Sequence, residues 1–281
     1  MSHLISVDAF RNIQNDDNLL IFDATFVLPA MKRNAPIEFE QIHIPGAQFF
    51  DIDKIADQES DLPHMVPSAD DFGAMMRDLG MNQDHKVVVY DNSPFLSAAR
   101  AWWLLRLFGK QQVYVLDGGL PAYVTAGGDT THGSVPAPNK GNFTPQAPLA
   151  QLMLFDELRK NIEDGTDIQI IDARPQGRFD GTIAEPRAGL RSGHMPGAIN
   201  VPVTDLLDKQ TGLLQNKQSL TEIFTKAGLD FTRPAITSCG SGVTAAGLTL
   251  ALAELGKYDI ALYDGSWAEW GASDAPINIS S

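Results

Sequence analysis

The sequence predicts an α/β protein with two similar domains, each a mostly parallel sheet flanked by helices. Three observations support this prediction. Motifs of the first half recur in the same order in the second half, short β-branched segments end at a polar residue and a turn, and segments with helical periodicity lie between them. Strands that alternate with helices are typical of parallel sheets covered on both faces. Ligands of such sheets bind beyond the carboxyl ends of the strands, so we expect functional residues there.

The internal repeat divides the chain. Three pairs of segments match: LLIFDAT with IQIIDAR, HIPGAQFF with HMPGAINV, and VYVLDGGLPAY with IALYDGSWAEW. The second and third pairs are separated by 151 (194 − 43) and 147 (260 − 113) residues, a difference that small loop insertions explain. The stretch 126–150 between the copies is rich in Gly, Pro, Thr and Asn and resembles a linker. We therefore predict an N-terminal domain at 1–130, a linker at 131–150 and a C-terminal domain at 151–281.

The elements of each copy follow from short segments. We expect strands in LLIFDA, KVVVYDNS and VYVLDGG of the first copy, and in IQIIDAR, PAITSCG and IALYDGS of the second. Helices are expected in SAARAWWLLRLFG and TAAGLTLALAELG, each closed by a glycine suited to a left-handed helix end. By this alignment Asp91 and Cys239 follow corresponding strands, since 239 − 91 = 148 agrees with the repeat.

Composition limits the classes of protein. The chain has 281 residues, a formal net charge of −14 and one cysteine, so an internal disulfide is impossible. The N-terminus lacks the features of a secretory signal, and no apolar run reaches the roughly 18 residues of a membrane span, which predicts a cytoplasmic protein. The negative charge argues against partners such as nucleic acid or an anionic membrane. An anionic small substrate therefore requires a local cluster of arginines.

The single cysteine occurs in SCGSGVTAAG, residues 238–247, between a predicted strand and a helix that begins at about Thr244 or Ala245. Glycines let several backbone N–H groups converge on one point, and the helix N-terminus adds a partial positive charge. Such an environment favours the reactive thiolate form of a cysteine, and it also suits a persulfide. The amides expected to line this cradle are those of Gly240, Ser241, Gly242, Val243 and Thr244. The alternative is that Cys239 is a small buried hydrophobic residue, as free cysteines often are.

Several of these motifs together resemble one family. CGSGVTA, the repeated HIPGA and HMPGA, FEQIHIPGA and IALYDGSWAEW are similar, in this order over nearly the whole chain, to the tandem rhodanese sulfurtransferases. The resemblance implies two rhodanese-like domains of which only the second is catalytic, with Asp91 at the nucleophile's position in the first. Relatives that prefer thiosulfate usually carry basic residues in the active loop. Gly240 and Ser241 are neutral, and the loop resembles that of 3-mercaptopyruvate sulfurtransferases.

The resemblance also implies substrate-binding residues. The acidic chain contains an arginine-rich segment, RPQGRFDGTIAEPRAGLRSGH. Within it the resemblance assigns Arg178 and Arg187 as ligands of a substrate carboxylate, a group that arginine binds in bidentate fashion. We expect Arg174 and Arg191 to be surface charges or structural ion pairs instead.

Two histidines precede the repeated P-G-A. We expect His194 to tie a turn to a strand. The resemblance implies that His43 reaches the loop serine, so His43 and Ser241 form a candidate proton-handling pair. Asp23 and Asp172, at strand ends, should bond backbone groups. No metal-ligand spacing is present, and neither a metal nor another cofactor is expected.

The chemistry implied is a two-step transfer through a Cys239 persulfide from 3-mercaptopyruvate to cyanide or to a thiol acceptor such as thioredoxin, releasing pyruvate. Three alternatives remain open from the residues. A thiosulfate:cyanide sulfurtransferase would differ in donor kinetics. A cysteine phosphatase would normally end its loop in an arginine, where this chain has Val243 and Thr244. A binding-only rhodanese module would be expected to lack the cysteine.

Overall fold

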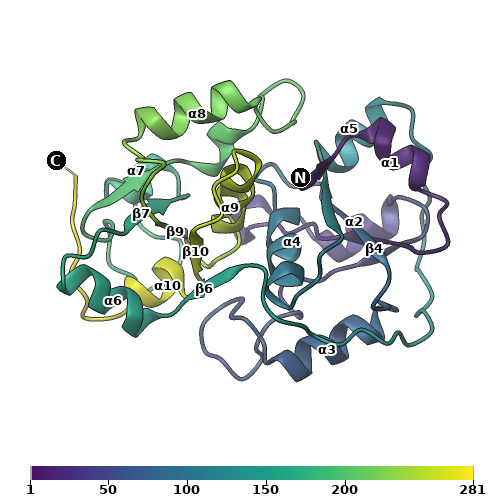
Figure 1. Ribbon diagram of the computed structural model, residues 1–281, viewed down its shortest axis with the longest axis horizontal. Coiled ribbons are helices and arrows are strands. Elements are labelled where there is room, and N and C mark those ends of the chain that lie inside the picture. The colour runs from purple at the N-terminus through teal and green to yellow at the C-terminus, as the bar shows by residue number, and fades with distance from the viewer. Residues whose placement is uncertain (1, 281) are drawn as a thin grey trace. The chain divides into compact units, whose positions relative to one another are not determined.

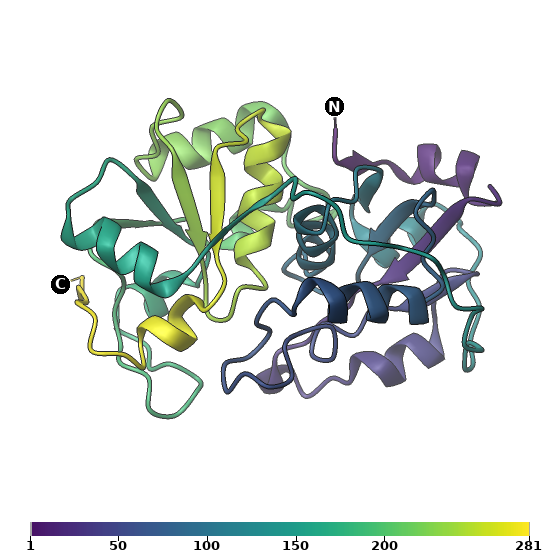
Figure 2. The ribbon, with the colours of Figure 1, turned by 60° about the horizontal axis from the view of Figure 1, so that its bottom comes forward.

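The structure, a computed structural model, describes residues 2–280 and divides into two compact units (Figures 1 and 2). The first unit contains the residues up to Gln58, Val66–Leu149 and Asp208–Leu214. The second contains Glu59–Met65, Ala150–Leu207 and the residues from Gln215 onward. Glu59–Met65 thus belongs to the second unit and Asp208–Leu214 to the first. The predicted domains, which are continuous in sequence, do not include this exchange.

The first unit has a five-stranded parallel sheet in the order β1-β5-β4-β2-β3 within the described residues. Its strands are β1 (Leu4–Ile5), β2 (Leu19–Asp23), β3 (Ala47–Phe49), β4 (Lys86–Tyr90) and β5 (Val113–Leu116). Its helices are α1 (Val7–Ile13), η1 (Pro29–Met31), α2 (Ala35–Gln41), α3 (Ala69–Asp78), α4 (Ala98–Leu107) and α5 (Gly119–Thr125).

The second unit repeats this sheet in the described chain, with five parallel strands in the order β6-β10-β9-β7-β8. Its strands are β6 (Gln151–Met153), β7 (Gln169–Asp172), β8 (Ala198–Asn200), β9 (Ala235–Ser238) and β10 (Ile260–Tyr263). Its helices are α6 (Phe155–Glu163), α7 (Gln176–Phe179), η2 (Val203–Leu206), α8 (Lys217–Lys226), α9 (Ala245–Glu254) and α10 (Ser266–Trp270). The prediction of an α/β chain with two parallel sheets is confirmed.

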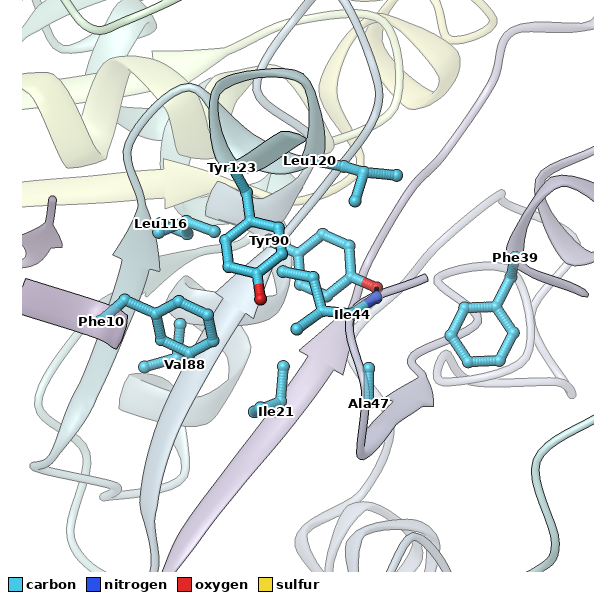
Figure 3. Close-up of a cluster of buried hydrophobic side chains, with 10 residues drawn as sticks. All are labelled: Phe10, Ile21, Phe39, Ile44, Ala47, Val88, Tyr90, Leu116, Leu120 and Tyr123. Carbon is cyan, nitrogen blue, oxygen red and sulfur yellow. Dashed lines mark hydrogen bonds between the residues drawn. The ribbon is translucent and has the colours of Figure 1, made fainter. Parts of the chain in front are cut away.

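One face of the first sheet packs on the helices α1, α2 and α5. Figure 3 shows the cluster of buried side chains on this face, in which Phe10, Phe39 and Tyr123 come from the helices. The Tyr90 hydroxyl, at the end of β4, accepts the Ile44 N–H at 3.1 Å, so the polar end of this buried ring is bonded.

The second sheet is covered on both faces. On one face Leu158 of α6 and Trp267 and Trp270 of α10 pack against strand residues such as Ile236. On the other face lies α9, whose Thr249 hydroxyl is 2.8 Å from that of Thr237 on β9. Successive residues of β9 point to opposite faces of the sheet, and both faces are covered, so all four residues of the strand are buried. The loop that follows its carboxyl end is therefore where side chains can reach a ligand.

Glycines end the two central helices as expected. Gly109 follows α4 with φ +85° and Gly256 follows α9 with φ +86°, the left-handed conformation that closes helices. Residues 131–149, expected as a linker, are extended and pack on the first unit. Phe143 is fully buried and its N–H donates to the Met81 carbonyl at 3.0 Å. In the described part of the chain, no helix is both long and apolar enough to cross a bilayer.

Candidate active site

Cys239 is the first residue after β9, and five further loop residues lead to α9. Its side chain is 2% exposed. The helix begins at Ala245 with Thr244 as its N-cap, as predicted, and the Thr244 side chain makes no capping bond. The positive end of α9 is therefore open toward the loop.

The loop amides form a cradle without a protein acceptor. Across the described residues, the N–H groups of Gly240, Ser241, Val243 and Thr244 donate to no protein acceptor. Ser241 and Val243 are buried, and buried backbone N–H groups without partners are rare in folded proteins. Such groups, at a helix N-terminus, are suited to hold an anion beside the cysteine sulfur.

The Ser266 side chain holds the backbone of the cysteine loop through hydrogen bonds. Its hydroxyl accepts the N–H groups of Cys239 and Gly242, each at 3.1 Å, donates to the Tyr263 carbonyl at 2.9 Å, and lies 3.9 Å from the Cys239 sulfur. The next residue, Trp267, donates its N–H to the Cys239 carbonyl at 2.9 Å. The start of α10 therefore fixes the backbone of the nucleophile.

Two of the four non-glycine residues with positive φ in the described chain contact this loop. Ser266 has φ +50° and His64 has φ +62°, although neither is glycine. His64 is buried, belongs to the second unit, and has Nδ1 3.3 Å from the Ser241 carbonyl oxygen. Non-glycine residues in this conformation cost on the order of 1 kcal/mol or more and cluster at functional sites.

Replacing Ser266 by glycine tests the support of the loop. Glycine tolerates the positive φ but leaves the Cys239 and Gly242 amides without their acceptor, so we expect kcat/KM for sulfur transfer to fall about tenfold. Steady-state rates and the thermal unfolding midpoint should be measured together. A variant with unchanged kcat/KM would show that the hydroxyl does not position the nucleophile.

The corresponding site of the first unit is filled by its own carboxylate. Asp91 follows β4 as Cys239 follows β9, as predicted. Its Oδ2 accepts the Ala98 N–H at the start of α4 at 2.8 Å, the Ser97 hydroxyl at 3.0 Å and the Ser93 hydroxyl at 2.9 Å. Burial raises the pKa of Asp91, and these hydrogen bonds oppose that rise. In the first unit the Asp91 carboxylate therefore accepts the hydrogen bonds at this strand end. In the second unit most loop N–H groups at the equivalent place have no protein acceptor in the described chain.

Arg178 lies against the cysteine loop. A Cβ added to Gly240 would lie 3.1 Å from the Arg178 Nη2, so this glycine leaves room for the guanidinium. Arg178 is also paired with Glu185, which accepts from its Nε at 3.1 Å and from its Nη2. The structure thus brings together the predicted residues Arg178, Gly240 and Cys239.

Arg174 forms the structural ion pair expected of it, whereas Arg191 is half-buried and bonds backbone carbonyls instead. Arg174 is buried, pairs with Asp172 at 2.8 Å, and stacks 4.1 Å from the ring centre of Trp267. Burial alone would lower the pKa of Arg174, but the charges of Asp172 and Glu185 raise it above its ordinary value. Arg191 donates to the carbonyls of three residues near the C-terminus of the chain, Trp270, Gly271 and Ala275.

Arg187 is half-buried in the segment between α7 and β8. It follows Glu185 by two residues, so the Cα atoms of these two residues lie within about 7 Å of each other. In the part of the chain that the structure describes, no carboxylate is within 4 Å of the Arg187 guanidinium. Its role as a substrate ligand stays a prediction.

His43 and His194 occupy equivalent structural positions. The Nδ1 of His43 is 2.7 Å from the Phe39 carbonyl oxygen, and that of His194 is 2.9 Å from the Phe179 carbonyl oxygen. Each histidine ring also stacks on the phenylalanine whose carbonyl it contacts. The ring centroids are 4.3 Å apart for His43 and Phe39 and 3.9 Å apart for His194 and Phe179. His194 has a structural role as expected, although its ring bonds the end of helix α7 rather than a strand. These contacts of His43 all lie within the first unit, and its pairing with Ser241 stays a prediction.

The strand-end aspartates bond backbone groups as expected. Asp23 accepts the Thr25 N–H at 2.9 Å, and Asp172 accepts the Arg174 N–H at 2.9 Å. Asp172 additionally forms the ion pair with Arg174. Within residues 2–280, no group of three or more His, Cys, Asp or Glu side chains is arranged to hold a metal ion.

Sequence reasoning missed three residues of the site: Ser266, His64 and Glu185. Ser266 had a usable signal, because the repeat aligns it with Gly119, which has φ +58°. A serine at a position that demands a left-handed backbone suggests that its hydroxyl is needed. His64 has no partner in the repeat, and Glu185 is one acidic residue among 35 in the chain, so neither stood out.

Comparison with known proteins identifies the family of the chain. The family model of the rhodanese-like domain matches residues 6–126 and 154–273. The 3-mercaptopyruvate sulfurtransferase of Escherichia coli strain K12 is 44% identical over 266 residues, covering 94% of this chain and 93% of the relative. The human 3-mercaptopyruvate sulfurtransferase is 39% identical, covering 98% and 92%. The crystal structure of the Tum1 protein from Saccharomyces cerevisiae matches with a TM-score of 0.91 at 32% identity, covering 99% of this chain and 98% of that one. The chain belongs to the rhodanese-like family and carries two of its domains in tandem.

Proposed function

We propose that the chain is a 3-mercaptopyruvate sulfurtransferase that works through a persulfide on Cys239. The observation that carries this proposal is the placement of the cysteine among loop amides that have no protein acceptor in the described chain. Curated relatives with this activity are 37–44% identical over nearly the whole chain.

In the first step the Cys239 thiolate attacks the sulfur of 3-mercaptopyruvate. The S–S bond forms as the C–S bond breaks, and the electron pair of that bond stays on carbon as the pyruvate enolate. The proton of the substrate thiol leaves the new persulfide and an equivalent proton reaches the enolate carbon, so no net proton is required. The amides of Gly240, Ser241, Val243 and Thr244 hold the negative outer sulfur, whereas the Gly242 amide, also expected in the cradle, donates to Ser266.

In the second step an acceptor attacks the outer sulfur and releases the Cys239 thiolate. Cyanide yields thiocyanate, and a thiol yields its persulfide. We propose a small thiol or a thioredoxin as the acceptor in a reducing, cytoplasmic setting, because the catalytic cysteine must return to the thiolate in every cycle.

The donor carboxylate is proposed to bind Arg187 and Arg178. Arg178 lies against Gly240, and Arg187, in the segment between α7 and β8, forms no ion pair in the described residues. Pyruvate release with 3-mercaptopyruvate, measured against thiocyanate formation from thiosulfate at equal ionic strength, tests this assignment. A higher kcat/KM for thiosulfate would favour the alternative thiosulfate:cyanide activity.

A histidine is proposed to assist Ser241 in returning the proton. His43 is one candidate, and His64 is a second, supported by its contact with the Ser241 carbonyl. We expect His64→Asn, in which asparagine tolerates the left-handed backbone, to lower kcat about 100-fold, a typical loss for a proton-transfer residue. We expect His43→Asn to lower the unfolding midpoint and leave kcat nearly unchanged, because it removes the bond to Phe39. If His43→Asn instead lowers kcat at an unchanged midpoint, His43 is the partner of Ser241.

A further inference from the structure

Glu185 is a buried carboxylate between two arginines beside the cysteine loop. Its side chain is 1% exposed. One oxygen accepts from Arg174 Nη1 at 2.9 Å and from Arg178 Nε at 3.1 Å, and the other accepts from Arg178 Nη2. This buried carboxylate accepts charge-assisted hydrogen bonds from both guanidinium groups and fixes their orientation.

Of the two arginines that Glu185 binds, Arg178 lies against the cysteine loop. Arg178 Nη2 would lie 3.1 Å from a Cβ at Gly240, the residue after Cys239. The loop residues Gly240 and Ser241 are neutral, yet a guanidinium reaches the loop from α7. The charge that a donor meets therefore depends on how far Arg178 is neutralised.

The charges of the ion-pair cluster that contains Arg178 can be counted. Arg174 and Arg178 contribute two positive charges, and Asp172 and Glu185, which bind them, contribute two negative charges. This quartet sums to zero. Arg187, the proposed ligand of the donor carboxylate, makes no ion pair in residues 2–280 and would add one net positive charge at the donor. A donor with one carboxylate matches this charge, whereas the thiosulfate dianion carries one negative charge too many.

We propose that Glu185 is a specificity-determining residue that limits the site to monoanionic donors by neutralising Arg178. The inference rests on the proposed function, since it concerns the choice between 3-mercaptopyruvate and thiosulfate. It assigns the preference to a carboxylate outside the loop rather than to the neutral loop residues alone. Glu185 acts through Arg178, so it is a positioning residue and touches no reacting atom.

The test is Glu185→Gln in the full-length protein, because glutamine keeps the shape and one acceptor oxygen but removes the charge. The measured quantity is kcat/KM for thiosulfate divided by kcat/KM for 3-mercaptopyruvate. This ratio does not depend on the fraction of enzyme that is folded, so partial unfolding does not disturb it. We expect the ratio to rise about tenfold or more, as one unit charge in a partly buried site predicts.

Two control variants separate charge from geometry. Glu185→Asp keeps the charge, so its ratio should stay within about twofold of the wild type even if both kcat/KM values fall. Glu163→Gln removes a carboxylate that pairs with Arg159 at 2.8 Å on the exposed surface, and its ratio should not change. An unchanged ratio in Glu185→Gln, or an equal rise in Glu185→Asp, overturns the proposal.

A separate readout keeps this test distinct from the proposed function. Wild-type protein incubated with 3-mercaptopyruvate should gain one sulfur on Cys239. If it gains the sulfur while the ratio in Glu185→Gln stays unchanged, the activity stands and the role of Glu185 is wrong. If the wild type gains no sulfur, the proposed function itself fails.

Discussion

Replacing Cys239 by serine should abolish sulfur transfer and leave both folded units intact. The chain has one cysteine, so no other thiol can carry the sulfur. Serine is close to cysteine in size, so little packing is lost at this buried position, and its hydroxyl does not form a persulfide. Pyruvate release from 3-mercaptopyruvate should fall below a few per cent of the wild-type rate.

The control for this variant is its unfolding transition, which should lie close to that of the wild type. Ser97→Ala is a control substitution at the corresponding region of the first unit. It removes a buried hydroxyl that is bonded to Asp91, and it should leave turnover intact. Residual activity of Cys239→Ser well above a few per cent, in protein that is folded, would remove Cys239 as the sulfur carrier.

Replacing Arg187 by alanine should lower kcat/KM for 3-mercaptopyruvate by roughly ten- to a hundredfold. A charge-assisted hydrogen bond to the donor carboxylate is worth about 1.5 to 3 kcal/mol, which gives this range. Arg178→Ala should cause a loss of similar size and should also lower stability, because it leaves the buried Glu185 with one arginine fewer.

The two arginine variants are distinguished by their unfolding midpoints. Arg187→Ala removes no ion pair of the described chain, so its midpoint should stay near that of the wild type. Arg159→Ala, which breaks a surface pair with Glu163, is the matched control and should leave kcat/KM unchanged. An unchanged kcat/KM in both Arg178→Ala and Arg187→Ala would place the donor carboxylate elsewhere.

The fold was predictable because its signals are local and occur twice. The segments KVVVY and AITS form strands β4 and β9, and each strand is followed by a helix that ends at a glycine. The repeat correctly placed Asp91 and Cys239 at equivalent strand ends. Because each element is expected in both copies, a strand or helix predicted in one copy can be checked against its counterpart in the other.

Other features depend on contacts between residues distant in sequence. The segment Glu59–Met65 belongs to the second unit, and nothing in its letters indicates a bond from His64 to Ser241, 177 residues away. Glu185 pairs with Arg174 and Arg178 across a loop that has no regular periodicity. Ion pairs of this kind are set by how the loop closes in three dimensions, so composition alone identified the arginines but not their partner.

The most direct test of the account is the intact mass of the protein after incubation with 3-mercaptopyruvate. We expect a gain of the mass of one sulfur atom, lost on addition of cyanide or dithiothreitol and absent from Cys239→Ser. Pyruvate release that occurs without any gain of sulfur on the protein, or a gain that persists in Cys239→Ser, would contradict a persulfide on Cys239.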